Sequence, residues 1–256
     1  MMDHTTLFSL HGRTALVTGA SRGIGQAVAV GLARAGANVV CASSAPGGAD
    51  ATRDLVEQTG RRGWSLAADL TRRDAVHALG AAAVEAAGRI DILVNNAGTI
   101  RRHPAVDFPA ESWDDVMRTN LDAAWLLSQQ LGAAMIGRGG GAIVNIASLL
   151  SFSGGVTVPA YTASKHAIAG LTKALANEWA GAGVRVNAVA PGYIETDNTE
   201  QLRNDPVRLQ QISARIPAGR WGRPDDLVGA VVFLASPAAA YIHGHVLVVD
   251  GGWMAR

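Results

Sequence analysis

The chain has 256 residues, 48% of them hydrophobic, and its 22 basic and 21 acidic residues leave a formal charge of +1. This length fits one large α/β domain or two small ones. The charge balance lacks the basic excess of a nucleic-acid-binding surface, so we expect no nucleic-acid partner. Cys41 is the only cysteine, which excludes an internal disulfide and favours a reducing compartment.

Targeting and membrane signals are not evident in the sequence. It contains no run of 18 or more apolar residues, so we expect no membrane span. The opening segment, MMDHTTLFSLHGR, has neither a cationic leader nor a long apolar core, so we expect no signal peptide. Together these expectations predict a cytoplasmic protein.

Seven short apolar runs alternate with longer stretches of helical pattern along the chain. We predict strands at residues 14–18, 38–42, 64–68, 92–95, 142–147, 184–190 and 246–249. Because these runs are apolar throughout rather than alternating, they favour a parallel sheet covered by helices on both faces. We therefore predict a single α/β domain over residues 1–256, built on a doubly wound, Rossmann-like parallel sheet of about seven strands.

The longest interruption of this alternation is the polar segment 192–224, which follows the sixth predicted strand. In an open α/β sheet, ligands bind at the carboxyl ends of the strands. A long insertion at that edge is a candidate substrate lid. The alternative is a surface excursion with one or two helices of its own.

The segment TGASRGIG, residues 18–25, joins the first predicted strand to a predicted helix. Its three glycines let the backbone turn tightly and approach a pyrophosphate, while the helix amides point at the anion. The spacing G-x-x-x-G-x-G differs from the usual dinucleotide spacing G-x-G-x-x-G. We predict that this loop binds a dinucleotide through Gly19, Ser21, Arg22, Gly23, Ile24 and Gly25.

Five features occur in an order and spacing typical of one family: TGASRGIG, NNAG at 95–98, Ser148, Tyr161 with Lys165, and APG at 190–192. The chain therefore resembles the short-chain dehydrogenases/reductases over nearly its whole length. The resemblance implies an enzyme that transfers hydride between NAD or NADP and a CH–OH group, and assembly as a homotetramer. It also implies a catalytic tetrad of Asn120, Ser148, Tyr161 and Lys165.

Tyr161 and Lys165 are four residues apart in a predicted helix and share one face. A phenol has a pKa near ~10, and a nearby ammonium favours the phenolate. We predict that Lys165 lowers the pKa of Tyr161, which then exchanges a proton with the substrate oxygen. Ser148 is placed to hydrogen-bond that oxygen, and the resemblance implies that Asn120 helps a water chain reach the lysine. Taken singly, these residues also fit a surface pair, a strand-end serine and a helix-capping asparagine.

The choice between NAD and NADP usually depends on the end of the second strand, where an acidic residue binds the ribose of NAD. Ser43, which can hydrogen-bond a ribose hydroxyl, and Ser44 stand there instead, and Arg22 can pair with a 2′-phosphate. The residues thus leave both cofactors open, and the resemblance favours NAD without excluding NADP. It also implies cofactor contacts from Asp69, Leu70, Asn96, Ala97, Gly98, Tyr161, Lys165, Pro191, Gly192, Ile194 and Thr196.

Arg101 and Arg102 follow the fourth predicted strand, in a loop expected to overhang the site. Two guanidiniums suit a carboxylate, although the pair also fits a solvated surface. The segments AGTIRRHPAVDF, APGYIETDNTEQLR and RIPAGRWG resemble family members that act on sugar acids, gluconate and its deoxy derivatives among them. We predict a sugar-acid substrate contacted by Arg101, Arg102, Ser148 and Tyr161.

Two further functions remain open at this stage: reduction of 3-oxoacyl thioesters by the same tetrad, and dinucleotide sensing without turnover. The Tyr161–Lys165 pair argues against a sensor, and the arginine pair argues against a thioester. His243 and His245 form a close histidine pair, but no cysteine or carboxylate lies within a few residues of them. We therefore expect no metal site.

Overall fold

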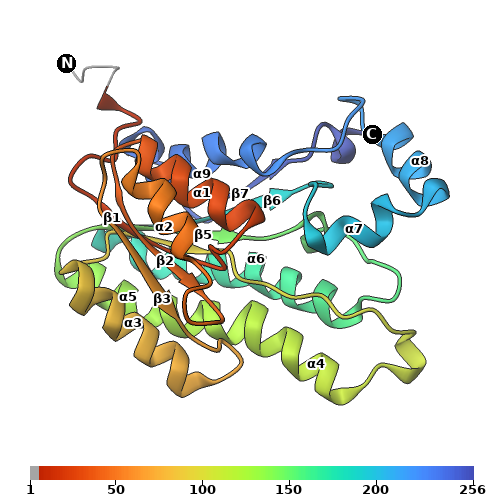
Figure 1. The fold of residues 1–256 in the computed structure, drawn as a ribbon, viewed down its shortest axis with the longest axis horizontal. Coiled ribbons are helices and arrows are strands. Elements are labelled where there is room, and N and C mark those ends of the chain that lie inside the picture. The colour runs from red at the N-terminus through yellow and green to blue at the C-terminus, as the bar shows by residue number, and fades with distance from the viewer. Residues whose placement is uncertain (1–5) are drawn as a thin grey trace.

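The computed structural model describes residues 6–256 (Figure 1). Residues 1–5, which begin the segment in which we expect no signal peptide, lie outside the described residues. Seven strands form one sheet of order β3-β2-β1-β4-β5-β6-β7, and every neighbouring pair is parallel. The strands are β1 (Thr14–Thr18), β2 (Asn38–Ser43), β3 (Gly63–Ala67), β4 (Ile92–Asn95), β5 (Gly141–Ile146), β6 (Val184–Pro191) and β7 (Val246–Val249).

Helices cover both faces of this sheet, which confirms the predicted fold class. In Figure 1, α1 (Gly23–Arg34) and α9 (Val228–Ala235) lie above the sheet, and α3 (Arg73–Ala87) and α5 (Ala123–Gly137) lie below it. The other helices are α2 (Asp50–Glu57), α4 (Ala110–Met117), α6 (Pro159–Trp179), α7 (Asp197–Arg203) and α8 (Pro206–Arg215). Each predicted strand matches an observed strand to within one residue at either end.

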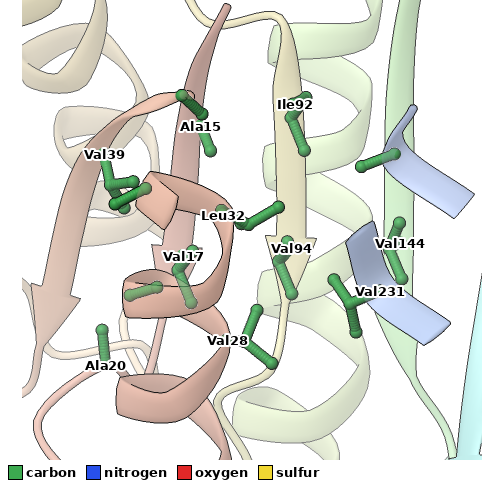
Figure 2. Packing of buried hydrophobic residues seen from close by; sticks show 14 of the residues in the cluster. Ala15, Val17, Ala20, Val28, Leu32, Val39, Ile92, Val94, Val144 and Val231 are labelled. Carbon is green, nitrogen blue, oxygen red and sulfur yellow. The ribbon is translucent and has the colours of Figure 1, made fainter. Parts of the chain in front are cut away.

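Alternate residues of each central strand enter different cores. Val17, Val94 and Val144 pack against α1 and α9, where Figure 2 shows Val28 and Val231 among them. Their neighbours Leu16, Leu93 and Ile143 belong to a second cluster with side chains of α3, α5 and α6. Both faces of these strands are thus buried, which is why the strand sequences are apolar throughout.

The strand order reverses between β1 and β4, since β1 leads outward to β2 and β3 while β4 leads to β5, β6 and β7. In doubly wound folds this switch point leaves a crevice beyond the carboxyl ends of the strands. The glycine loop follows β1, Asn96 follows β4, Ser148 follows β5 and Gly192 follows β6. The topology therefore gathers the predicted site residues at one edge of the sheet.

The polar segment 192–224 forms α7 and α8, which lie together at one end of the molecule (Figure 1). It has a small core of its own, in which Ile212, Ile216 and Trp221 are buried and Tyr193 packs against them. Among residues 6–256, no helix combines the length and the apolarity needed to cross a bilayer. The same residues hold no group of three or more His, Cys, Asp or Glu side chains arranged for a metal ion.

Candidate active site

The glycine loop is held tightly against β4. Gly19 has a φ of +65°, and a Cβ there would lie 2.9 Å from the Cα of Ala97. A Cβ on Gly25 would overlap the Gly19 carbonyl. Asn96 fixes the loop, because its Nδ2 donates hydrogen bonds to the carbonyls of Thr18 at 2.9 Å and Gly19 at 3.1 Å. Glycine is therefore required at positions 19 and 25 by the packing itself.

The helix that follows the loop presents free amides. α1 begins at Gly23 without a side-chain cap and without an acidic residue in its first turn. Its first amides have no partner within the helix, and the helix dipole favours an anion at this end. The loop therefore fits the pyrophosphate of a dinucleotide, as its sequence predicts.

A cleft of about 270 Å³ runs from this loop to Tyr161. Its walls include all the predicted contacts from the glycine loop, from residues 96–98 and from the segment after β6. Ser148, Tyr161 and Lys165 also line it. The sequence did not single out five more wall residues, Ile146, Ala147, Asp197, Asn198 and Thr199.

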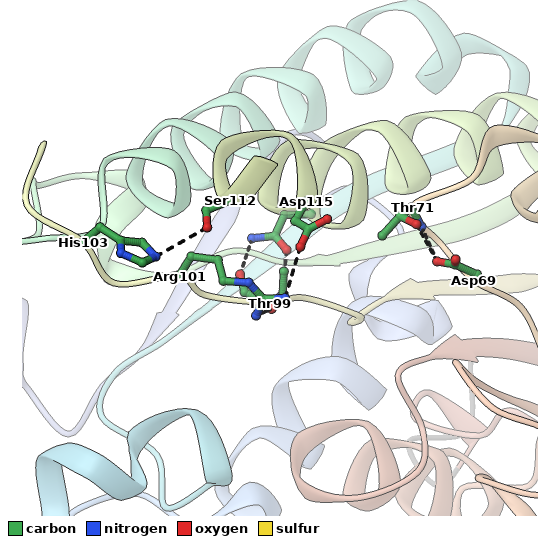
Figure 3. A network of polar contacts seen from close by, with 8 residues as sticks. Asp69, Thr71, Thr99, Arg101, His103, Ser112 and Asp115 are labelled. Carbon is green, nitrogen blue, oxygen red and sulfur yellow. Dashed lines mark hydrogen bonds and ion pairs between the residues drawn. The ribbon is translucent and has the colours of Figure 1, made fainter. Parts of the chain in front are cut away.

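Three predicted cofactor contacts lie outside the walls of this cleft. The Ser43 hydroxyl donates to the Ala45 carbonyl at 2.9 Å. Asp69 accepts from the amide and hydroxyl of Thr71, as Figure 3 shows, and these bonds hold the pKa of its carboxyl below the usual value. Leu70 packs against the second core cluster. Local hydrogen bonds thus account for the positions of Ser43 and Asp69, and core packing accounts for the position of Leu70.

Tyr161 and Lys165 face each other on α6. The Lys165 Nζ lies 5.5 Å from the centroid of the Tyr161 ring and donates a 2.6 Å hydrogen bond to the Ile146 carbonyl at the end of β5. The lysine is 4% exposed. Burial lowers its pKa to about 8, because an ammonium loses hydration inside the protein.

The pKa of Tyr161 differs from the sequence prediction. Burial raises the pKa of the phenol, while a hydrogen bond with Ser148 and the positive charge of Arg102 act in the opposite direction. We predicted that Lys165 would lower this pKa, but the loss of solvent outweighs the nearby charges in the protein alone. The phenol is therefore protonated at neutral pH.

Asn120 lies in a π-helical turn, Arg118–Asp122, between α4 and α5. It is 3% exposed and is not the N-cap of α5, which is Asp122. Its Oδ1 accepts from the Thr99 amide at 2.8 Å, and its Nδ2 donates to the Thr99 carbonyl at 3.0 Å and to the Ser164 hydroxyl at 3.2 Å. The side chain thus joins the loop after β4 to the helix that carries Tyr161.

The two predicted carboxylate ligands separate in the structure. Arg101 donates to the Asp115 carboxylate at 3.2 Å and to the Thr99 hydroxyl at 3.0 Å, in the polar network of Figure 3. It does not line either cavity beside Tyr161. Arg102 lines the second of these cavities and donates to the Asn198 carbonyl at 3.2 Å. The structure thus places Arg102, and not Arg101, at the site.

This second cavity has a volume of about 600 Å³ and adjoins the cofactor cleft. Ser148, Tyr161, Pro191 and Gly192 belong to the walls of both. Its charged wall residues are all arginines: Arg102, Arg208, Arg215 and Arg256. The sequence analysis missed the last three, although Arg208 and Arg215 are seven residues apart in the predicted lid and so share a helix face.

An ion pair spans the mouth of the cofactor cleft. Nε of Arg22, in the glycine loop, lies 2.5 Å from Oδ2 of Asp197, the first residue of α7. Both side chains are more than 60% exposed, so the pair contributes little stability by itself. It connects the candidate lid to the loop that fits the pyrophosphate.

Comparison with known proteins identifies the class. A family model of short-chain dehydrogenases, described as Enoyl-(Acyl carrier protein) reductase, matches residues 19–254. The chain belongs to the short-chain dehydrogenase/reductase family, whose members are NAD(P)-dependent oxidoreductases acting on CH–OH groups. This membership confirms the resemblance stated from the sequence motifs.

Individual relatives match along nearly the whole chain. The 2-dehydro-3-deoxy-D-gluconate 5-dehydrogenase of Bacillus subtilis (strain 168) is 54% identical, with 97% of each chain covered. A solved structure from Beutenbergia cavernae, described as a candidate NAD(P)-dependent gluconate 5-dehydrogenase with NADP at low occupancy, has a TM-score of 0.94 and 53% identity, covering 98% of this chain and 100% of its own. A gluconate 5-dehydrogenase from Burkholderia cenocepacia J2315, in complex with NADP and tartrate, has a TM-score of 0.95 and 38% identity, covering 99% and 100%.

Proposed function

We propose that this chain transfers hydride between a nicotinamide cofactor and a secondary hydroxyl or ketone of a sugar acid, of the 2-dehydro-3-deoxy-D-gluconate or 2-deoxy-D-gluconate type. One observation carries the proposal: Ser148 and Tyr161 line both the cleft that fits the dinucleotide and the cavity lined by arginines. A proton-transfer group therefore stands where a cofactor and an anionic substrate meet. The name of the Bacillus subtilis relative supports the choice of sugar acid.

Each residue of the proposed tetrad has a separate task. When bound, the nicotinamide supplies the hydride acceptor for oxidation and the hydride donor for reduction. Ser148 hydrogen-bonds the substrate oxygen and orients it toward Tyr161. Tyr161 takes the hydroxyl proton in oxidation and returns it to the nascent alkoxide in reduction. Lys165 supplies positive charge beside the phenol, and Asn120 holds α6 in register with the loop after β4.

Arg102 is the proposed ligand from the loop after β4. Its guanidinium lines the substrate cavity, and its charge acts on the phenol of Tyr161. A planar guanidinium can grip a carboxylate with paired hydrogen bonds. The apolar wall residues Leu149, Leu150 and Val158 suit the carbon chain of the same substrate.

The cofactor preference is a proposal of its own. Residues 43–46 at the end of β2 include no carboxylate, so this segment does not repel a 2′-phosphate. The NADP described in the two structural relatives supports NADP. We propose that the enzyme accepts both dinucleotides, and the preference for NAD stays a prediction from sequence, as do the homotetramer and the cytoplasmic location.

A panel of substrates tests the proposal. Purified protein is mixed with NAD or NADP and with 2-deoxygluconate, gluconate or 3-deoxy-hexulosonate, and cofactor reduction is followed by absorbance. Gluconate is the runner-up substrate, supported by the names of the two structural relatives. A small 3-oxoacyl thioester with reduced cofactor tests acyl reduction, and cofactor binding without any turnover would indicate a sensor. The proposal fails if no sugar acid is turned over with either cofactor.

A further inference from the structure

The substrate cavity carries more positive charge than the loop after β4 supplies. Arg102 comes from that loop, Arg208 and Arg215 come from α8, and Arg256 ends the chain. No aspartate or glutamate belongs to the same walls. An uncompensated group of guanidiniums favours an anion in this cavity.

These arginines differ in the contacts that their guanidinium groups already make within the protein. Arg256 donates to the Ala214 carbonyl at 2.7 Å, at the carboxyl end of α8. The Arg215 guanidinium lies over the Trp253 ring, 4.1 Å from its centroid. Within residues 6–256, the side chain of Arg208 makes only one hydrogen bond, to Gln211, and it is long at 3.5 Å. Both α8 arginines keep donors for a ligand, but Arg215 is stacked on Trp253, whereas Arg208 makes only this long hydrogen bond and can turn its donors to a ligand.

Tyr193 stands beside these α8 arginines. Its ring packs between Trp221, with centroids 5.2 Å apart, and Trp253, with centroids 4.7 Å apart. Burial raises the pKa of its phenol, and the charges of Arg208 and Arg215 oppose that shift. The two aromatic contacts fix the ring, while its hydroxyl has no hydrogen-bond partner among the described residues. Tyr193 and Arg208 line the same cavity, and each keeps a donor for a ligand there.

Two phenols line the cavity, Tyr161 on α6 and Tyr193 after β6, and different arginines act on each. The charge of Arg102 acts on Tyr161, whereas the charges of Arg208 and Arg215 act on Tyr193. A sugar acid placed with its reacting hydroxyl at Tyr161 extends its chain away from that residue. A carboxylate several carbons along the chain then reaches the Tyr193 end.

We propose that Arg208 and the hydroxyl of Tyr193 form a carboxylate subsite for the sugar acid, carried by α8 and distinct from Arg102. The inference rests on the proposed function, because it assigns the acid group of the same substrate. It gives the segment 192–224 a role in specificity, since the helix that covers the cavity also supplies a ligand. Arg215 and Arg256 act as supports that hold Trp253 and α8 in place.

Four single variants test this subsite with the best sugar acid of the panel. Arg208→Gln removes the charge, and Arg208→Lys keeps the charge but not the paired N–H donors of the guanidinium. Tyr193→Phe removes only the hydroxyl. Arg34→Gln is the control, since Arg34 is an exposed arginine at the last turn of α1 that lines neither cavity. Steady-state kinetics gives kcat and KM, calorimetry gives the Kd of NADP, and thermal unfolding checks the fold.

We expect Arg208→Gln to raise KM roughly ten- to a hundredfold, as for loss of a hydrogen bond to a charged group. Arg208→Lys recovers part of this loss, and Tyr193→Phe raises KM by about threefold to tenfold. The Kd of NADP stays within twofold throughout, and Arg34→Gln behaves as wild type. A wild-type KM in both Arg208→Gln and Tyr193→Phe would overturn the subsite. A wild-type enzyme inactive on every sugar acid would instead overturn the proposed function itself.

Discussion

The ammonium of Lys165 lies 5.5 Å from the centroid of the Tyr161 ring, one turn further along the buried face of α6. The Lys165 ammonium donates a hydrogen bond to the Ile146 carbonyl. The Tyr161 phenol hydrogen-bonds with Ser148 and lies in the electrostatic field of Arg102. Burial raises the pKa of the Tyr161 phenol and lowers the pKa of the Lys165 ammonium, and both shifts are opposite to those that attraction between a phenolate and an ammonium would produce.

Replacing Tyr161 with phenylalanine removes the proposed proton donor and keeps the ring. General acid–base groups contribute about 10²–10⁴ to rate, so we expect kcat to fall by that factor in both directions. The Kd of NADP measured by calorimetry stays close to wild type, because the ring still fills its place in the cleft wall. Retention of full velocity by Tyr161→Phe would remove the basis of the proposed mechanism.

The two reaction directions respond oppositely to pH. Because burial raises the pKa of Tyr161, the phenol is protonated near neutrality, and the phenolate fraction grows by up to tenfold per pH unit. Oxidation needs the phenolate, so its kcat/KM rises from pH 7 to pH 9. Reduction needs the phenol, so its kcat/KM stays level over the same range. Initial rates at saturating cofactor measure both, and a pH-independent oxidation rate would contradict the assignment.

Replacing Lys165 with methionine is expected to change the stability and the activity of the protein in opposite directions. The folded pKa of about 8 lies below the usual lysine value of 10.5, so burying the ammonium costs up to about 3 kcal/mol below pH 8. This penalty is relieved as pH rises from 8 toward 10.5, where the folded lysine is neutral. Part of the gain is offset because the Ile146 carbonyl loses its donor.

We therefore expect Lys165→Met to be inactive yet more stable than wild type at pH 7 by about 1–2 kcal/mol. The difference shrinks at pH 9.5, where less of the penalty applies. Denaturant unfolding at the two pH values measures it. The prediction is contradicted if the gain in unfolding free energy over wild type is smaller at pH 7 than at pH 9.5.

Arg101 and Arg102 form a matched pair of neighbours with different surroundings. Arg102→Ala is expected to raise the KM for sugar acids roughly tenfold or more, because it removes a charged ligand from the cavity. Arg101→Ala loses only an exposed ion pair with Asp115, worth about 0.2–1 kcal/mol of stability. Its KM stays near wild type. Equal changes in KM for the two variants would show that the structure does not distinguish them.

Glycines 25 and 229 provide a second matched pair. A methyl group at Gly25 meets the backbone of Gly19, which cannot move without opening the loop, so Gly25→Ala is expected to lose about 1–3 kcal/mol of stability and at least tenfold in cofactor affinity. Gly229 lies in α9 with open space around its Cα. Gly229→Ala is expected to gain up to about 1 kcal/mol without changing affinity. Thermal unfolding and calorimetric titration with NADP measure both.

The strands, the glycine loop and the spacing of Ser148, Tyr161 and Lys165 could all be predicted from the amino-acid sequence. These features are local, because each can be recognised from a few neighbouring residues. They are an apolar run, a turn that only glycine permits, and two side chains four residues apart on a helix. Their order along the chain also sufficed to predict the parallel sheet and the edge at which the site lies.

Which arginines reach the site, and the direction of the pKa shift of Tyr161, could not be predicted before the chain's elements were placed in space. Arg101 and Arg102 are equivalent in sequence, and their difference depends on Asp115 and Asn198, which are 14 and 96 positions away. The α8 arginines line one cavity with Tyr193 only because α8 packs against the segment that follows β6. The raised pKa of Tyr161 depends on burial by surrounding elements, and solvent exclusion is a property of packing that no short segment encodes.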